Sequence, residues 1–348
     1  MKKFLFLFIL ATGCTLALSA KVQIGDLYYF LDDDNGTATV TWEKFGSKAN
    51  YEGHASIDIP GKVIYEGKSY RVNLIGNNAF NSCQMTTVVI SDNIEKISQD
   101  AFNRCTNLST IIWGKAGSLK EIEQNSFSNC AIESLTIPDG VQTLWNSFCF
   151  CRHLKTVVIP ASAEAIKYHC FVGCDSLKAI YVDPANPNYC SEDGLLFDKQ
   201  KTTLLTYPLG RPDRRFSVPE SVTRIDDHVF YESGEHLQTV ILHAGVKSLG
   251  YQTFCFSEVD TIISYAIVPP TIDTETFLCC YAIMYAPDGS CEDYLPVWHQ
   301  RVYPLSSLPQ GLEDVQEDKV QCTKILRDGN IYIRREDKTY NALGAEVK

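Results

Sequence analysis

Basic residues are the scarce charged component of this chain of 348 residues, which has 31 lysines and arginines against 42 aspartates and glutamates. The formal net charge at pH 7 is −11. A surface that binds nucleic acid needs clustered lysine and arginine to neutralise phosphates. The densest basic group is Arg211, Arg214 and Arg215, which we interpret as a solvated loop between prolines. The composition therefore argues against nucleic acid as a partner.

Long hydrophobic runs are absent after residue 20. Residues 1–20 start with Lys2 and Lys3, continue with an apolar run too short to cross a bilayer, and end at Ser19 and Ala20. This pattern is typical of a secretory signal peptide, so we expect a secreted or outer-surface protein whose mature chain lacks a transmembrane segment. An alternative interpretation makes Cys14 the lipidated residue of a lipoprotein.

The usual catalytic motifs are also missing. The sequence contains no P-loop, no G-x-S-x-G, no H-E-x-x-H and no paired C-x-x-C of the zinc type. An enzyme needs acids and bases that converge on a pocket, and no pattern in the sequence indicates one. We therefore predict no catalysis, no cofactor and no resident metal.

An internal repeat is the feature that the sequence does have. Segments align on a phenylalanine at steps of 22, 25, 21 and 23 residues, and later copies follow at steps of 24 and 23. A period of this length indicates a solenoid of stacked coils, which together bury one continuous dry interior. The aligned residues are Phe80, Phe102, Phe127, Phe148, Phe171, Phe230, Phe254 and Phe277.

The second half of each copy has the form L-x-x-V-x-I and predicts one short strand per coil. Alternate residues of a strand face opposite sides, so Val157 and Ile159 are expected inside while Thr156 and Val158 face outward. The first half of each copy supplies apolar residues that fill the space behind the strand. The predicted fold is a solenoid that is mainly β, with short irregular or 3-10 segments in each coil.

Six cysteines stand three residues after the repeat phenylalanine, and we predict that they stack as a column of small apolar side chains. Without Cys14, 13 cysteines remain, so at least one is unpaired in a monomer. Free thiols are the favoured interpretation. A disulfide between neighbouring coils stays open, because the coils lie about 4.8 Å apart. The column is Cys83, Cys105, Cys130, Cys151, Cys174 and Cys280.

Departures from the repeat divide the chain into segments. Residues 21–69 contain two strand pairs and predict an N-terminal β-hairpin cap. Residues 70–303 are the solenoid, interrupted at 183–219 by an insertion that predicts a hairpin projecting from the stack. Residues 304–324 are polar and acidic and predict a flexible linker, and residues 325–348 predict a small β tail.

Two histidines share a position in the repeat. His169 and His228 each precede a repeat phenylalanine by two residues, so they are expected on neighbouring coils near Asp226 and Asp227. Two imidazoles and a carboxylate could bind a divalent metal, but nothing fixes a third protein ligand. We interpret them as polar residues at a variable loop position.

The outward side of the strands is the best candidate for a binding site. One outward column is rich in threonine and the next is mostly aliphatic, so together they form a nearly uncharged strip. Strand propensity explains β-branched residues on a pleated surface, whereas a contiguous exposed apolar strip also marks a contact surface. Both interpretations stay open. The candidate ligand-binding residues are Val89, Ile112, Val158, Tyr181, Ile241 and Ile263.

The repeat pattern, with Ile-Pro steps at Ile137 and Ile159, resembles the BspA-like leucine-rich repeats of Bacteroidetes surface proteins over residues 24–303. The likeness includes the NPNYCSEDGLLF segment of the insertion and the segment APDGSCEDYLPVW. It implies a leucine-rich repeat solenoid in a surface adhesin that binds host extracellular matrix or other surface proteins. The final segment resembles C-terminal tails of secreted Bacteroidetes proteins, which implies a role in sorting.

The sequence thus predicts a secreted or cell-surface repeat protein that mediates protein or cell-surface recognition without catalysis. The strand side and the projecting hairpin are the expected contact regions. The alternative is a glycan-binding accessory protein, in which Trp113, Tyr181 and other exposed aromatic rings stack on sugars.

Overall fold

The computed structural model describes most of the chain after residue 20. The expected signal peptide with Cys14, and residues 310–321 of the expected linker, lie outside the described residues. Within 322–347 only the backbone of four strands is described. The other described ranges are 21–45, 50–115, 117–167, 169–233, 236–298 and 301–309.

The N-terminal residues form a strand-rich cap on the first coil. Three strands, β1 (Lys21–Ile24), β2 (Leu27–Asp32) and β3 (Thr37–Thr41), make an antiparallel meander. Strand β3 then pairs in parallel with β6 (Lys68–Ile75), which forms a hairpin with β5 (Lys62–Tyr65). Because β3 lies parallel to the first coil strand, its buried residues cover an end of the stack that would otherwise be open.

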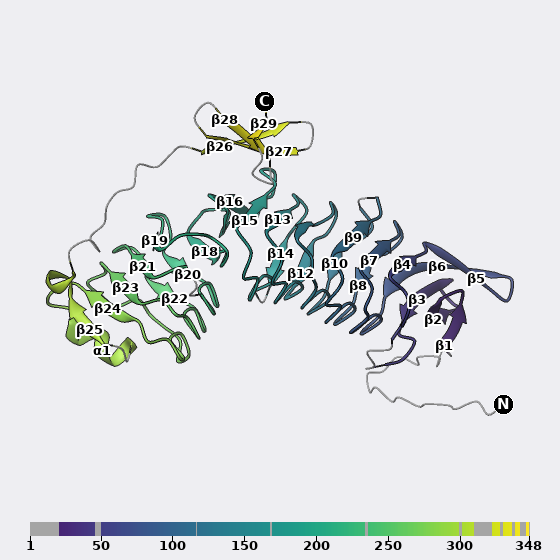
Figure 1. The fold of residues 1–348 in the computed structure, drawn as a ribbon, viewed down its shortest axis with the longest axis horizontal. Coiled ribbons are helices and arrows are strands. Elements are labelled where there is room, and N and C mark those ends of the chain that lie inside the picture. The colour runs from purple at the N-terminus through teal and green to yellow at the C-terminus, as the bar shows by residue number, and fades with distance from the viewer. Residues whose placement is uncertain are drawn as a thin grey trace.

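Each following coil contributes a short strand to each of two parallel stacks, which run along an arched molecule (Figure 1). The first stack continues from β6 with β8 (Lys96–Ile97), β10 (Glu121–Ile122), β12 (Thr143–Trp145) and β14 (Ala165–Lys167). The second consists of two three-stranded sheets that follow one another along the molecule. They are β4 (Ser56–Ile59), β7 (Thr87–Ile90) and β9 (Thr110–Trp113), then β11 (Ser134–Thr136), β13 (Thr156–Ile159) and β15 (Ala179–Val182). We call the outward side of the second stack the strand face.

The predicted inward and outward positions are confirmed in these strands. Val157 and Ile159 are fully buried, while Thr156 and Val158 are half-exposed. The register is the same from coil to coil, since Val158 lies opposite Thr136 on one side and Tyr181 on the other. Equal repeat positions therefore form straight columns, and the predicted solenoid is confirmed.

The repeat phenylalanines form the centre of the core. The rings of Phe80, Phe102, Phe127 and Phe148 are fully buried and nearly parallel, with centroids 5.0, 4.8 and 5.3 Å apart in that order. The cysteine column lies beside them, and its thiols bond to the previous coil. For example, Cys105 Sγ donates to the carbonyl oxygen of Phe80 at 3.0 Å. Cysteine at this position thus fills a small apolar space and supplies one weak donor.

Tight turns flank each phenylalanine, and they explain the residues found there. Positions two before and two after the phenylalanine have φ near +50 to +68° in most coils, a region that asparagine, aspartate, histidine and glycine tolerate best. Asn78, Asp100 and His169 occupy the first position in their coils. Gly173 occupies the second position, where an added Cβ would lie 2.3 Å from the ring of Phe150.

The insertion contains the expected hairpin, but the hairpin does not project. Strands β17 (Leu195–Asp198) and β18 (Thr203–Thr206) are antiparallel, and Leu195, Leu196, Phe197 and Leu204 are all buried. Strand β18 pairs in parallel with β20 (Arg224–Ile225), so it is itself a coil strand of the first stack. The expected projection is wrong because this apolar run is needed inside the stack.

The insertion also divides the core, which corrects the expectation of one continuous interior. Strand β17 has one face toward each half, since Leu196 belongs to the N-terminal cluster of buried residues while Leu195 and Phe197 belong to the C-terminal cluster. Successive side chains of a strand point to opposite sides, so a single strand can serve both. The arch in Figure 1 has this region at its middle.

The C-terminal half repeats the two stacks. The first continues with β18, β20 and β22 (Ser248–Leu249), and the second holds β19 (Arg215–Ser217), β21 (Thr239–Leu242), β23 (Thr261–Ser264), β24 (Ile283–Ala286) and β25 (Val302–Pro304). Helix α1 (Cys291–Trp298) covers the end, with the Trp298 ring 4.6 Å from that of Phe277.

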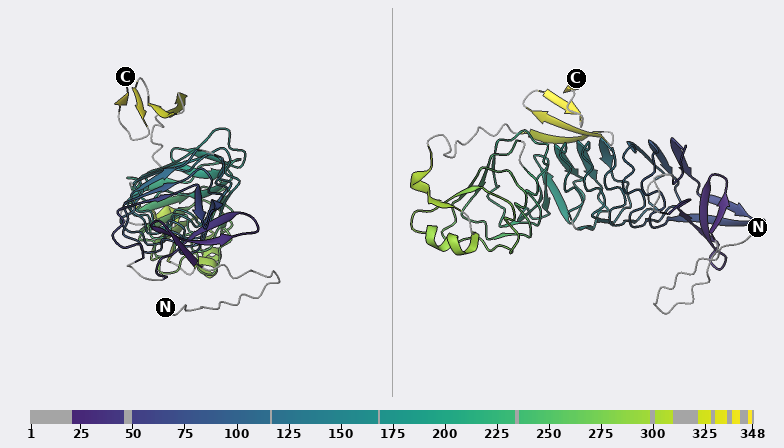
Figure 2. Two further views of the ribbon diagram at one scale, coloured as in Figure 1. Left: turned by 90° about the vertical axis from the view of Figure 1, so that its right-hand side faces the viewer. Right: turned by 60° about the horizontal axis from the view of Figure 1, so that its bottom comes forward.

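The last described strands form a sheet of their own outside the stack (Figure 2). Successive strands in it are antiparallel. They are β26 (Cys322–Arg327), β27 (Asn330–Arg335), β28 (Lys338–Asn341) and β29 (Glu346–Val347). Strand β16 (Tyr189–Glu192) belongs to the insertion, where it pairs with β17 in antiparallel fashion.

Candidate binding surface

The N-terminal part of the strand face is open over the predicted apolar column. Ile112 is 49% exposed and lies opposite Val89 in the neighbouring strand. Val89, Val158 and Tyr181 are half-buried. Four of the six predicted residues therefore line one side of one stack.

Polar groups border this column. The next outward column holds Thr87, Thr110 and Thr156, and Asp58 is in register with Val89 at the N-terminal end. Near the start of β11 and β13, Lys155 Nζ lies 2.8 Å from Glu133 Oε2 in an exposed ion pair. An apolar centre with a polar border is the usual anatomy of a protein contact surface.

The strand face is closed in the C-terminal half, which corrects two predicted site residues. Ile241 is 2% exposed and Ile263 is fully buried, so neither presents a surface. They pack with Tyr285 under Leu305 and Leu308, which belong to the segment around the 3-10 helix η1 (Leu305–Ser307).

The sequence contains a pattern that could have predicted the segment covering Ile241 and Ile263. Leu305 and Leu308 are three residues apart, which is one turn of a 3-10 helix and places both on one side. The expected linker began at residue 304, yet Pro304 is in β25 and Leu308 still packs on the stack. The polar composition of the segment from residue 304 led to the linker prediction, although Leu305 and Leu308 attach its first residues to the stack.

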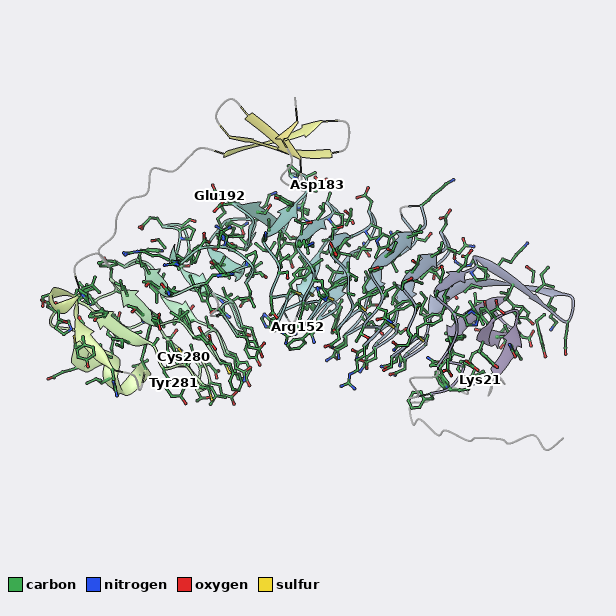
Figure 3. All side chains as sticks on the ribbon, in the orientation of Figure 1. Lys21, Arg152, Asp183, Glu192, Cys280 and Tyr281 are labelled. Atoms are coloured by element: carbon green, nitrogen blue, oxygen red, sulfur yellow. The ribbon has the colours of Figure 1, made fainter. Side chains whose placement is uncertain are left out.

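The insertion closes the other end of the open surface. The backbone N–H of Ile180 in β15 donates to the carbonyl oxygen of Gly194 at 2.8 Å, and the N–H of Val182 donates to Ser191 Oγ at 2.9 Å. The free edge of β15 is therefore covered, as sheet edges in native proteins usually are. Asp183 and Glu192, at the two ends of this turn of chain, are both labelled above the stack in Figure 3.

An arginine expected in solvent holds the insertion in place. The Arg211 side chain is only 13% exposed, and its guanidinium pairs with Asp193 at 2.8 Å and with Asp213 at 2.5 Å. The interpretation of its segment as a solvated loop is therefore wrong for Arg211. Its charge is shared between the exposed carboxylate of Asp193 and the partly buried one of Asp213.

The aromatic residue offered for sugar stacking does not lie on the strand face. Trp113 is opposite Ile90, which is buried, so its side chain has the inward orientation of that register. Its ring lies 5.9 Å from the Phe127 ring in an edge contact. A glycan site built on Trp113 is therefore wrong for this face.

The two histidines come together as the repeat register predicts. The ring centroids of His169 and His228 are 4.5 Å apart, and His169 Nε2 is 3.8 Å from Asp227 Oδ2. Burial lowers the pKa of both imidazoles, and in His169 the neighbouring His228 lowers it further. The negative charges of Asp226 and Asp227 raise the pKa of both imidazoles and so oppose this effect in part.

The described ranges hold neither a cluster of metal-ligating side chains nor a membrane-spanning helix. In this part of the chain no three or more His, Cys, Asp or Glu side chains group as a metal site. No helix there is long and apolar enough to span a bilayer. The interpretation of His169 and His228 as polar residues at a variable loop position stays a prediction.

Comparison with known proteins supports the architecture. The sequence matches the BspA type leucine rich repeat region in six copies, over residues 73–191 and 214–286. No curated protein shows a significant match.

Solved structures agree at the level of the fold. A leucine-rich repeat protein from Eubacterium ventriosum is 19% identical with a TM-score of 0.57, and the alignment covers 81% of this chain and 83% of that one. The pneumococcal vaccine antigen PcpA is 17% identical with a TM-score of 0.55, and covers 82% of this chain and 98% of its own. At such identities the likeness concerns the fold alone.

Proposed function

Since the chain belongs to the BspA-type leucine-rich repeat proteins, we propose that it is a surface-recognition protein that binds a protein partner through the open strand face. Leucine-rich repeat proteins in general bind other proteins, and their stacked coils offer a long preformed surface. The open surface is defined by Val89, Ile112, Val158 and Tyr181, on β7, β9, β13 and β15.

One observation carries this proposal. The equivalent C-terminal positions, Ile241 and Ile263, are covered by Leu305 and Leu308 of the same chain, so this face of the repeat accepts apolar side chains. The N-terminal columns have a similar composition, and Ile112 remains 49% exposed. An exposed apolar strip of this kind is typical of a contact surface.

The mechanism is contact over an area rather than binding in a pocket. The strands are held in register by parallel ladders and by the stacked core, so little ordering accompanies binding. A stable complex of this type buries about 800 Å² on each partner. Several coils would contribute to that area, and no single residue would account for the whole affinity.

The proposal includes the setting of the protein. Residues 1–20 would direct export, and the partners would be host extracellular matrix proteins or other surface proteins. The chain would act without catalysis or cofactor. These statements rest on the N-terminal sequence pattern and on the family, whose members are surface proteins.

The test uses charge substitutions on the strand face. Ile112→Asp and Val158→Asp should each weaken partner binding by about tenfold or more, because a desolvated carboxylate would lie within the contact. Binding is measured by pull-down of the mature chain against matrix and bacterial surface fractions, then by titration with the captured partner.

Ile64→Asp is the matched control, because Ile64 is a 61% exposed isoleucine on the cap strand β5. It should bind like the unsubstituted chain. Undiminished binding by both strand-face variants, with folding verified by thermal unfolding, would refute the proposed surface.

A further inference from the structure

Aromatic rings form a second exposed feature, on the tight turns where the two halves of the solenoid meet. The His228 ring lies 4.5 Å from His169, 5.4 Å from Tyr231 and 5.5 Å from Tyr251, measured between centroids. Tyr231 in turn lies 6.0 Å from Phe256. We call these five rings the aromatic ribbon. Tyr251 is 38% exposed and Phe256 is 49% exposed, so ring surface is open to solvent.

The ribbon is a local departure from the repeat. At the position two before the repeat phenylalanine, the N-terminal coils carry Asn78, Asp100 and Asn125. Those side chains suit a positive φ and are polar. His169 and His228 take the same backbone conformation, with φ of 55° and 57°, so the turn does not require an imidazole.

A small recess between the halves lies beside part of the ribbon, since His169, His228 and Tyr231 line it whereas Tyr251 and Phe256 do not. The recess is lined from the N-terminal side by His169 and Phe171, and from the C-terminal side by Tyr207, His228 and Tyr231. Coil-to-coil backbone bonds exist on either side, such as Phe148 N–H to the Cys170 oxygen and Phe230 N–H to the Thr253 oxygen. Within the described residues, no such backbone hydrogen bond joins residues 169–172 to residues 228–231. The two turns therefore face each other without a backbone bond between them.

Carboxylates held by hydrogen bonds lie beside the aromatic ribbon. Glu275 Oε2 accepts from the Tyr251 hydroxyl at 2.7 Å and from the Gln252 amide at 2.6 Å. Asp227 Oδ1 accepts from the Tyr251 backbone N–H at 2.8 Å. His228 Nδ1 is buried and has no hydrogen-bond partner in the described part of the chain.

The charges limit the class of ligand. Asp226, Asp227 and Glu275 would repel phosphate, sulfate or carboxylate groups. Arg224 already pairs with Asp226 at 2.9 Å and with Asp227 at 3.5 Å. A cationic ligand would therefore have to compete with Arg224 for these two carboxylates. An uncharged ligand meets neither obstacle.

We propose that the aromatic ribbon binds a neutral oligosaccharide. One side of a pyranose ring presents C–H groups and stacks on an aromatic face, while the hydroxyls at its rim donate to carboxylates. Sites for small ligands commonly combine aromatic surface with a few placed polar groups. This site is separate from the strand face and goes beyond the proposed protein recognition.

The test is calorimetric titration of the full chain with neutral homo-oligosaccharides of glucose, galactose, mannose and xylose. At least one should bind, and Tyr251→Ala or Phe256→Ala should weaken that binding by about tenfold, as loss of one stacking ring does. Tyr251→Phe keeps the ring and should lose less. If Tyr251→Ala fails to fold, the titration of Phe256→Ala decides the outcome, because Phe256 is exposed.

Tyr281→Ala is the matched control, because Tyr281 is 88% exposed beside Cys280 and is not part of the ribbon (Figure 3). It should bind like the unsubstituted chain, and so should Val158→Asp, which separates this site from the strand face. The proposal is overturned if no sugar of the panel binds at millimolar concentration, or if the ribbon variants bind normally. Binding of polylysine alone, sensitive to Tyr251→Ala, would also overturn it.

Discussion

At the scale of single residues, the repeat places side chains in environments that change their chemistry. Burial raises the pKa of the Cys151 thiol to about 12 and that of Cys170 to about 11. A thiol of this kind carries little thiolate at neutral pH and is a poor nucleophile. Both cysteines therefore act as small core residues with a donor, which is the role that the sequence indicates for Cys151 and the rest of its column.

The histidine pair gives a pH prediction at the same scale. Because burial holds the pKa of His169 and His228 below the ordinary 6.5, the unfolded chain takes up protons first as pH falls. Their contribution to stability is therefore complete above pH 6.5 and is lost as pH falls through the lowered values. The opposing effect of Asp226 and Asp227 is smaller than that of burial.

Denaturant unfolding between about pH 8 and pH 5 measures this effect. His228→Asn suits the same positive φ, because Asn146 holds the equivalent position two residues before its own repeat phenylalanine. The variant should therefore fold and show a shallower loss of stability toward pH 5. An identical pH profile for this variant and the unsubstituted chain would contradict the assignment, since carboxylates common to both would then explain the loss.

At the scale of elements, one short segment decides which part of the strand face is open. Leu305 and Leu308 each contribute a partly buried side chain over Ile241 and Ile263. Removing both with Leu305→Ala and Leu308→Ala should expose this patch and reduce stability by about 2–4 kcal/mol, from lost apolar burial.

Hydrogen exchange locates that change. Amides of β21, β23 and β24 should exchange faster in the double variant, while those of β11 and β13 stay protected, because repeat coils interact mainly with their neighbours. Equal loss of protection in both regions would show that the leucines support the whole stack rather than a local cover.

At the scale of the whole molecule, the division of the core predicts two partly independent halves. Phe102 and Phe254 are both fully buried between stacked neighbours, but they belong to different clusters of buried residues. Phe102→Ala and Phe254→Ala should each reduce stability by about 3–5 kcal/mol. Each should also accelerate hydrogen exchange mainly in its own half.

Strand β17 is the boundary in this prediction, since Leu196 and Phe197 connect the two cores. If each substitution accelerates exchange to the same degree in both halves, the solenoid unfolds as one unit. Strand β17 would then couple the stability of one half fully to that of the other. The comparison needs no functional assay, so it is independent of both binding proposals.

The sequence by itself determined the coil, its register and the inward residues. Phe102, Val157 and Cys105 could be placed because alternation along a strand and stacking of like copies are local rules, repeated in each coil. The meeting of His169 with His228 followed from the same register.

Only the tertiary structure decided which outward residues stay exposed. Ile241 and Ile112 occupy the same repeat position, yet Ile241 is buried in the cluster against which Leu308 packs and Ile112 is open to solvent. The insertion likewise turned inward at Leu196 rather than outward. These outcomes depend on contacts between segments outside the repeat, and no periodicity within one copy encodes where such a segment will pack.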